Sequence, residues 1–298
     1  MDDAVLEKYR KAGEVAKKAE KLARDIVKPG AKVLDIADKV EGLIWNESDG
    51  PAFPLNISIN EMAAHYTPDL KTELVFGETD LVKVDLGVHF DGYIADRAFT
   101  LSMDKDETRL GLIEAAEAGL KVGLECIRPG VTLGEIGTKI EEAIVEKGFK
   151  PISNLTGHGL EQYSLHTGLT IPNIKNDDKT VLEEGQAIAI EPFSTNGYGA
   201  VIDSEEVHIY EFLAPRSVRN REARRILELG VTKFKGLPFA RRWLEKDIGG
   251  MKLSLALREL VNARALYQYP ALREKERGLI AQAEHTVIVL EDPIITTR

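Results

Sequence analysis

Two aspartates, Asp85 and Asp96, are spaced so that a β-hairpin would bring their carboxylates together. Each lies in an apolar, β-branched run, and the Asp91-Gly92 dipeptide between the runs favours a two-residue type I′ turn. This turn sets Asp96 opposite Gly87 and Asp85 one diagonal step away on the same face. Gly87 leaves room there, so we expect a bulkier residue to crowd Asp96. Two like charges on a half-buried face need a cation, a shared proton or a basic partner. From spacing alone, a solvated pair and a metal or acid/base site remain equal alternatives.

Three more potential ligands follow in the second half of the chain. Glu191 and Glu284 each stand alone in a strongly apolar run, where a buried, ionised and unpaired glutamate is costly. His158 lies between two glycines. Taken singly, His158 also suits a turn, and Glu191 also suits the end of an exposed strand. With the hairpin aspartates they make a set of four carboxylates and one imidazole. Such a set suits divalent Mn, Fe, Co or Zn and includes carboxylates able to bridge two metals.

The elements that would carry these residues repeat along the chain. Shifting the sequence by 100 residues aligns Lys28-Pro-Gly with Arg128-Pro-Gly and gives eight identities between positions 16 and 44. Apolar residues at helical spacing predict two helices in each copy, over 4–28, 34–45, 106–127 and 133–147. A duplicated helix–turn–helix unit predicts approximate two-fold symmetry, with a site between the halves.

A basic segment precedes Glu284. Residues 216–273 carry 14 Lys and Arg against 5 Asp and Glu, although the whole chain has a net charge of −10. This asymmetry indicates a separate subdomain. Its apolar spacing predicts three helices, over 218–229 with Ser217 as N-cap, 239–246 and 253–266. We therefore expect an all-helical insertion at 200–272 and a catalytic domain made of 1–199 and 273–298.

The composition argues against several classes of protein. A net charge of −10 is unfavourable for a protein whose main ligand is DNA. The chain has no run of about 18 apolar residues, and its first ten residues are too charged for a secretory signal. A single cysteine excludes an internal disulfide. We expect a cytoplasmic protein without a membrane or DNA partner.

Taken in order, the ligand motifs resemble those of the methionine aminopeptidases. The matching motifs are Asp85 and Asp96 with ten residues between them, Gly157-His158-Gly159, Ala189-Ile-Glu191-Pro-Phe and Gln282-Ala-Glu284-His. The helical insertion and Asn60-Glu-Met-Ala-Ala-His-Tyr-Thr-Pro68 are similar to the type 2 branch, and the short N-terminal region is similar to its archaeal members. The resemblance extends over essentially the whole chain. It implies an α+β pita-bread fold, in which two pseudo-symmetric halves form a curved antiparallel sheet with helices on its outer face.

The resemblance also implies a role for each matching residue. Asp85 would hold one metal ion, His158 and Glu191 the other, and Asp96 and Glu284 would bridge them. Glu191 would also act as general base. Two further catalytic histidines are implied, His65 and His166, which would contact the scissile peptide and the oxyanion; without the resemblance, both would be interpreted as loop histidines. The methionine pocket would be lined by Phe53, Pro54, Asn56 and Leu165, with His208 at its rim.

The implied reaction is removal of the initiator methionine from nascent proteins. Two divalent metal ions, Co, Mn, Fe or Zn, would bridge a hydroxide that attacks the first peptide bond. Two alternatives share the fold: an aminopeptidase or dipeptidase for X-Pro bonds, and a binding protein without catalysis. The basic insertion also permits contact with ribosomal RNA, through Arg224, Arg225, Arg241 and Arg242, although a solvated helical face is the simpler interpretation.

Overall fold

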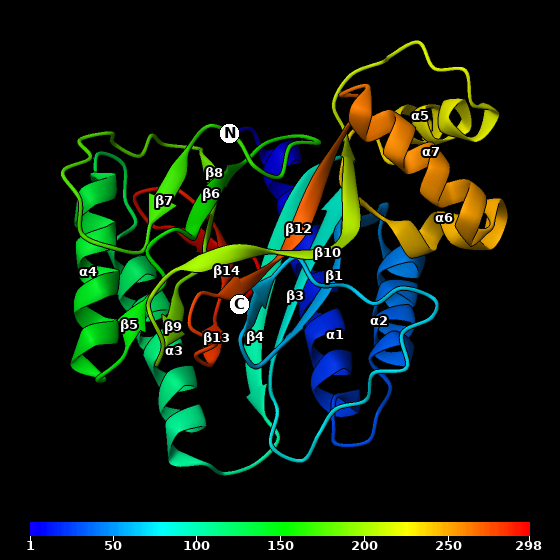
Figure 1. Cartoon of the computed structure of the whole chain (residues 1–298). Helices are drawn as coiled ribbons and strands as arrows, with labels where there is room; N and C mark the ends of the chain where they lie inside the picture. The colour runs from blue at the N-terminus through cyan, green and yellow to red at the C-terminus, as the bar shows by residue number, and fades with distance from the viewer.

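The computed structural model describes all residues, 1–298, and places helices outside curved antiparallel sheets (Figure 1). The helices are α1 (Asp3–Ile26), α2 (Val33–Glu47), α3 (Glu107–Cys126), α4 (Leu133–Glu146), α5 (Arg221–Thr232), α6 (Arg241–Ile248) and α7 (Gly250–Asn262). The strands are β1 (Gly50–Ile59), β2 (Met62–Ala64), β3 (Leu81–Phe90), β4 (Tyr93–Ser102), β5 (Lys150–Pro151), β6 (Thr156–Leu160), β7 (Thr170–Pro172), β8 (Ala187–Ile190), β9 (Phe193–Thr195), β10 (Val201–Phe212), β11 (Phe239–Ala240), β12 (Leu266–Glu274), β13 (Ile280–Gln282), β14 (His285–Ile288) and β15 (Ile294–Ile295).

The predicted hairpin forms with the predicted register. Strands β3 and β4 pair antiparallel from Phe90 opposite Tyr93 through Gly87 opposite Asp96. The turn residue Asp91 has φ 48° and the following glycine has φ 80°, as a type I′ turn requires. Strand β1 joins the other edge of β3, so the first sheet has the order β1-β3-β4. Because β3 is the central strand, its backbone is hydrogen-bonded to β1 on one edge and to β4 on the other, which fixes the position of Asp85.

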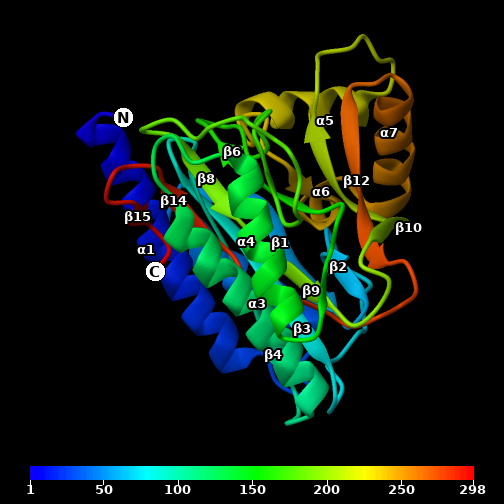
Figure 2. The same ribbon diagram turned by 90° about the vertical axis from the view of Figure 1, so that its left-hand side faces the viewer.

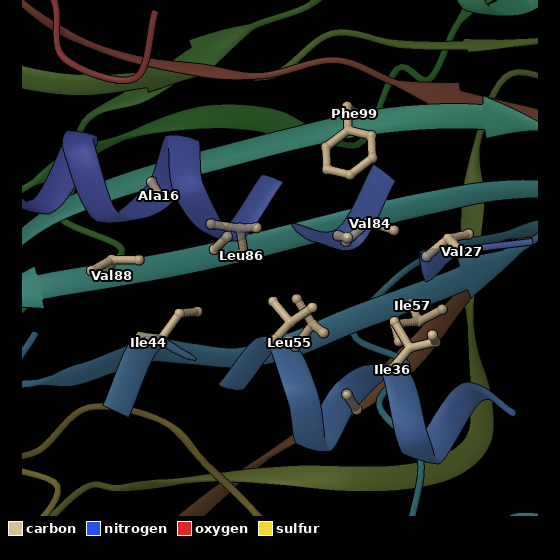
Figure 3. Packing of buried hydrophobic residues seen from close by; sticks show 14 of the residues in the cluster. Ala16, Val27, Ile36, Ile44, Leu55, Ile57, Val84, Leu86, Val88 and Phe99 are labelled. Carbon is tan, nitrogen blue, oxygen red and sulfur yellow. The ribbon is translucent and has the colours of Figure 1, made fainter. Parts of the chain in front are cut away.

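Small side chains let α1 lie close to this sheet. Ala16, Ala19 and Ala23 are fully buried against β3 and β4. Figure 3 shows Ala16 beside Leu86, and Ile36 of α2 beside strand β1. Each fully buried valine, leucine or isoleucine in this core contributes about 1.5–3 kcal/mol to folding. The resulting core supports the sheet from its outer face and leaves the inner face for the site.

The second half repeats the frame of the first. Gly30 and Gly130 adopt left-handed backbone, with φ 78° and 84°, and donate their N–H groups to Phe76 and Leu182 at 2.8 Å. Isolated bridges follow two residues after each glycine, Lys32 with Val75 and Thr132 with Val181. Helices α3 and α4 then pack outside a sheet of order β15-β14-β8-β6-β7 (Figure 2). The predicted duplication is therefore present in the structure.

The prediction of an all-helical segment at 200–272 is wrong at both ends. Strands β10 and β12 pair with each other there, in a sheet of order β11-β10-β12-β2. Helices α5, α6 and α7 come between these two strands in sequence, and they form a separate core at one end of the molecule (Figure 1). Helix α5 begins after Asn220, whose side chain accepts from two backbone N–H groups, rather than after Ser217. The strands were missed because their partners lie more than fifty residues away in sequence, where local periodicity carries no signal.

Candidate metal centre and substrate cleft

The five predicted ligands line one cleft of about 220 Å³. Each comes from a different strand or strand end. Asp85 lies on β3, Asp96 on β4, His158 on β6, Glu191 directly after β8 and Glu284 between β13 and β14. The first two belong to the first half of the fold and the others to the second. The cleft therefore lies where the two halves meet, as the duplication predicted.

The ligand atoms converge most closely around His158. Its Nε2 lies 3.8 Å from Asp96 Oδ2 and 3.5 Å from Glu191 Oε1. One ligand atom from each of Asp96, His158 and Glu284 lies within 4.8 Å of the others. These separations are compatible with a divalent cation held between nitrogen and carboxylate donors.

Gln282 connects the remaining ligand to the cluster. Its Nε2 donates to Asp85 Oδ2 at 3.2 Å and to Glu191 Oε2 at 3.3 Å, so one amide orients a carboxylate from each half. Sequence reasoning did not assign Gln282 a role. The available signal was its position two residues before Glu284, on the strand that enters the site. Asn173 adds a second support, because its Nδ2 donates to the backbone carbonyl of Glu191 at 3.0 Å.

Burial raises the pKa of the four carboxyl groups in this cluster. The pKa of Asp85 rises to about 6, although the hydrogen bond from Gln282 opposes the shift. For Asp96, burial raises the pKa well above its usual range and the charge of Asp85 adds to the effect. Glu191 and Glu284 shift in the same direction, first through burial and then through the neighbouring carboxylates. Concentrated negative charge out of water persists only with a compensating cation, and without one these carboxyl groups take up protons.

The protein itself compensates this charge only in part, through Arg97 near Glu284. Burial lowers the pKa of His158 to about 3, so its imidazole is neutral near pH 7. Arg97 directs its hydrogen bonds to Glu20 and to the backbone carbonyl of Glu284. Meanwhile Asp96 Oδ1 and both carboxylate oxygens of Glu284 are buried without a hydrogen-bond partner. Four carboxylates, one neutral imidazole and orphaned oxygens fit divalent metal ions.

Two glycines beside the ligands serve packing. A Cβ on Gly157 would lie 2.3 Å from the carbonyl oxygen of Ala189, so the strand that carries His158 can approach β8 only with glycine there. A Cβ on Gly87 would lie 3.1 Å from Ala52 Cβ and 3.2 Å from the backbone nitrogen of Phe53. A Cβ at Gly87 would therefore press first on β1, and the crowding of Asp96 by a larger side chain stays a prediction.

The predicted catalytic histidines lie on the wall of the same cleft. His166 lies against His158, with ring centroids 4.5 Å apart, and His65 lies 5.7 Å from Phe53. Burial lowers the pKa of both His65 and His166 to about 4, so both rings are neutral near pH 7. His65 also has φ 62°, a left-handed conformation that non-glycine residues adopt only when their surroundings impose it.

The predicted pocket residues divide into two groups. Phe53, Asn56 and Leu165 line the cleft with the ligands. Pro54 does not line it, although its carbonyl accepts from Asn56 Nδ2 at 2.9 Å. His208 also lies outside the lining, beside Glu206.

Tyr269 is an aromatic neighbour that sequence reasoning missed. Its ring centroid lies 5.1 Å from that of His65, 5.2 Å from Phe53 and 6.0 Å from His166. Its hydroxyl donates to Glu211 Oε2 at 2.5 Å. Tyr269 lies on β12, within the segment expected to be helical, so no pattern placed it near the site. A strand of the inserted segment thus lies beside His65 and His166.

The fold and the buried acidic centre define a metallopeptidase, and a family model agrees. The model of metallopeptidase family M24 matches residues 7–289, so the chain belongs to that family. Within it, the methionine aminopeptidase of Thermococcus onnurineus (strain NA1) is 48% identical over 289 residues, covering 96% of this chain and 97% of the relative. The chain is thus a member of the methionine aminopeptidase branch, as its motifs predicted.

Solved structures agree with the fold. A thermophilic Arx1 superposes with a TM-score of 0.88 at 19% identity, covering 99% of this chain and 91% of that one. The methionine aminopeptidase of Thermotoga maritima gives a TM-score of 0.73 at 23% identity, covering 100% of this chain and 98% of that one. The predicted pita-bread fold is confirmed.

Proposed function

We propose that the cleft removes the N-terminal methionine from peptides and nascent chains in the cytoplasm, with two divalent cations drawn from Mn, Fe, Co or Zn. The observation that carries this proposal is the convergence of five buried or half-buried ligands, some with orphaned carboxylate oxygens, in a cleft walled by histidines and an aromatic ring. No helix is long and apolar enough to cross a membrane.

The chain's own residues divide the work of binding and chemistry. Asp85 would hold one cation, His158 and Glu191 the other, and Asp96 and Glu284 would be shared. When bound, the cations supply a Lewis acid that polarises the peptide carbonyl and lowers the pKa of a water. We assign Glu191 as the general base that accepts a proton from this water.

The histidines and apolar side chains that line the cleft beside the carboxylates bind the peptide. The neutral rings of His65 and His166 present N–H donors to the scissile peptide and to the charge that develops on its oxygen. Phe53 and Leu165 give the methionine side chain an apolar surface, and Asn56 supplies a polar contact beside it. The narrow cleft selects a small second residue.

The test combines metal content with peptide cleavage in one preparation. We expect stoichiometric divalent metal and cleavage of a Met-Ala-Ser peptide, with little cleavage of an Ala-Pro peptide. Changing Asp96→Asn should lower metal content and reduce kcat/KM at least about a thousandfold, because an acidic group shared between cations is lost. Preference for Ala-Pro would favour the X-Pro enzyme, and absence of bound metal under all conditions would favour the binding protein.

The basic insertion is proposed to contact ribosomal RNA near the emerging chain. The structure changes which arginines can do so, because Arg242 is buried and ion-paired. Arg221, Arg224, Arg225 and Arg258 are exposed. Co-sedimentation with ribosomes should be salt-sensitive and should weaken when these four become Glu. Sedimentation that these changes leave intact would contradict the contact.

A further inference from the structure

One buried ion pair joins the inserted segment to the first half of the fold. Arg242 of α6 and Glu41 of α2 are 2% and 3% exposed, and Arg242 Nη2 donates to Glu41 Oε1. Trp243 donates its Nε1–H to the second carboxylate oxygen at 2.7 Å. Taking both charges out of water costs several kcal/mol per ion, so such a pair persists only where further hydrogen bonds complete it. Those further bonds lead to the substrate cleft.

On the Glu41 side, the carboxylate supports a bulge in β1. The pairing of β1 with β3 advances three residues on β1, from Phe53 to Asn56, against two on β3. Glu41 Oε1 accepts from Leu55 N at 3.0 Å, within this irregular stretch. A bulge re-aims the side chains beside it, and here Phe53 and Asn56 both line the cleft.

On the Arg242 side, the guanidinium fixes the turn that carries His65. Arg242 Nη1 donates to Thr67 Oγ1 at 2.6 Å and to the Pro68 carbonyl at 3.3 Å. Thr67 is fully buried and lies two residues after His65, whose φ of 62° must be imposed by its surroundings. The Arg242 guanidinium therefore holds the segment that orients His65, a proposed substrate-binding residue.

We propose that Glu41 and Arg242 are positioning residues of the substrate wall. The carboxylate fixes the bulge of β1, the guanidinium fixes the His65 turn, and their ion pair sets the distance between the two. Neither residue lines the cleft. The inserted segment is thus a structural component of the substrate site, whatever else binds to its outer surface. This inference rests on the proposed aminopeptidase function.

Two variants of the full chain test the arrangement. Arg242→Lys keeps the charge but lacks the fork that contacts Glu41 and Thr67 together. Thr67→Val keeps nearly the same shape and removes only the hydroxyl acceptor, so it serves if the lysine variant does not fold. Glu141→Gln is the matched control, because Glu141 occupies the equivalent position of the duplicated unit without such a pair. Each change is made alone and together with His65→Ala.

The expected result is a coupled loss of activity. Arg242→Lys and Thr67→Val should each lower kcat/KM for Met-Ala-Ser about tenfold or more in the parent chain, since small displacements of a positioned group are costly. In the His65→Ala background Thr67→Val should cost less than about twofold, because the group that it positions is gone. Arg242→Lys should keep part of its loss there, because the bulge of β1 is still disturbed through Glu41. Mn²⁺ affinity, measured by calorimetry, should not change. Glu141→Gln should leave every value unchanged.

Imidazole nuclear magnetic resonance gives a readout independent of turnover. The chain has six histidines, and the His65 signals are identified by their loss in His65→Ala. Thr67→Val should shift the His65 resonances and leave those of His285 in place. Equal losses of activity in both backgrounds, or unshifted His65 resonances, would overturn the positioning role. Inactivity of the parent chain with shifted resonances would instead reject the proposed function and leave the positioning role standing.

Discussion

The two halves of the fold use one inherited position in opposite ways. Glu41 and Glu141 are identical residues at equivalent points of the duplicated helix–turn–helix unit. Glu141 is half-exposed and accepts from the backbone nitrogen of Lys175 at 2.6 Å. Glu41 is buried beneath the inserted segment and paired with Arg242. Both carboxylates accept a backbone N–H, but only the one covered by the insertion is also a buried anchor for an arginine.

The halves also differ in how they supply ligands. The first half contributes Asp85 and Asp96 from one tight hairpin, whose turn fixes their relation locally. The second contributes His158, Glu191 and Glu284 from three separate segments, which only tertiary packing brings together. The ligands of the first half are therefore positioned by one local turn, and those of the second half by contacts between distant segments. Losses of packing should harm the second half first.

The largest expected difference between the halves is in stability. Glu41→Gln would leave the Arg242 charge buried and unpaired, which costs about 3–5 kcal/mol in the free energy of unfolding. Glu141→Gln retains an acceptor at a half-exposed site and should cost less than about 1 kcal/mol. Guanidinium denaturation of both variants measures the contrast. Equal losses would show that the insertion had not made Glu41 an anchor.

This contrast also marks what the sequence could reveal. The Asp91-Gly92 turn and the repeat are local or periodic signals, so the hairpin and four helices were predictable. The candidate ligands came instead from single carboxylates in apolar runs and from the resemblance of the motifs. The ion pair joins Glu41 and Arg242, which are 201 positions apart, and the local sequence of neither helix indicates a buried partner. Strands β10 and β12, and with them Tyr269, were missed for the same reason. Long-range pairing decides these features, and a single sequence does not encode it as a local pattern.

A smaller effect should follow from loosening the link between the halves. Gln282→Met preserves volume but removes the amide that donates to Asp85 and Glu191. Supporting groups of this kind typically contribute 10- to 100-fold to metal affinity. We expect a loss of about that size in Mn²⁺ binding by calorimetry, with the fold intact by circular dichroism. An unchanged affinity would mean that each half orients its ligands unaided.

The smallest difference concerns the glycines beside the ligands, and it tests whether the distributed half is the more fragile. Gly157→Ala places a Cβ 2.3 Å from a carbonyl oxygen of β8, which cannot move without shifting the strand that leads to Glu191. Overpacking of this kind costs about 1–3 kcal/mol. Gly87→Ala meets its neighbours on β1 at 3.1 and 3.2 Å, a contact that a bulged strand can relieve by a few tenths of an ångström. We therefore expect Gly157→Ala to lower the free energy of unfolding by about 1–2 kcal/mol more than Gly87→Ala, measured by denaturation of the metal-free chains. If Gly87→Ala proved the more damaging, the hairpin rather than the dispersed strands would be the rigid part on which the centre depends.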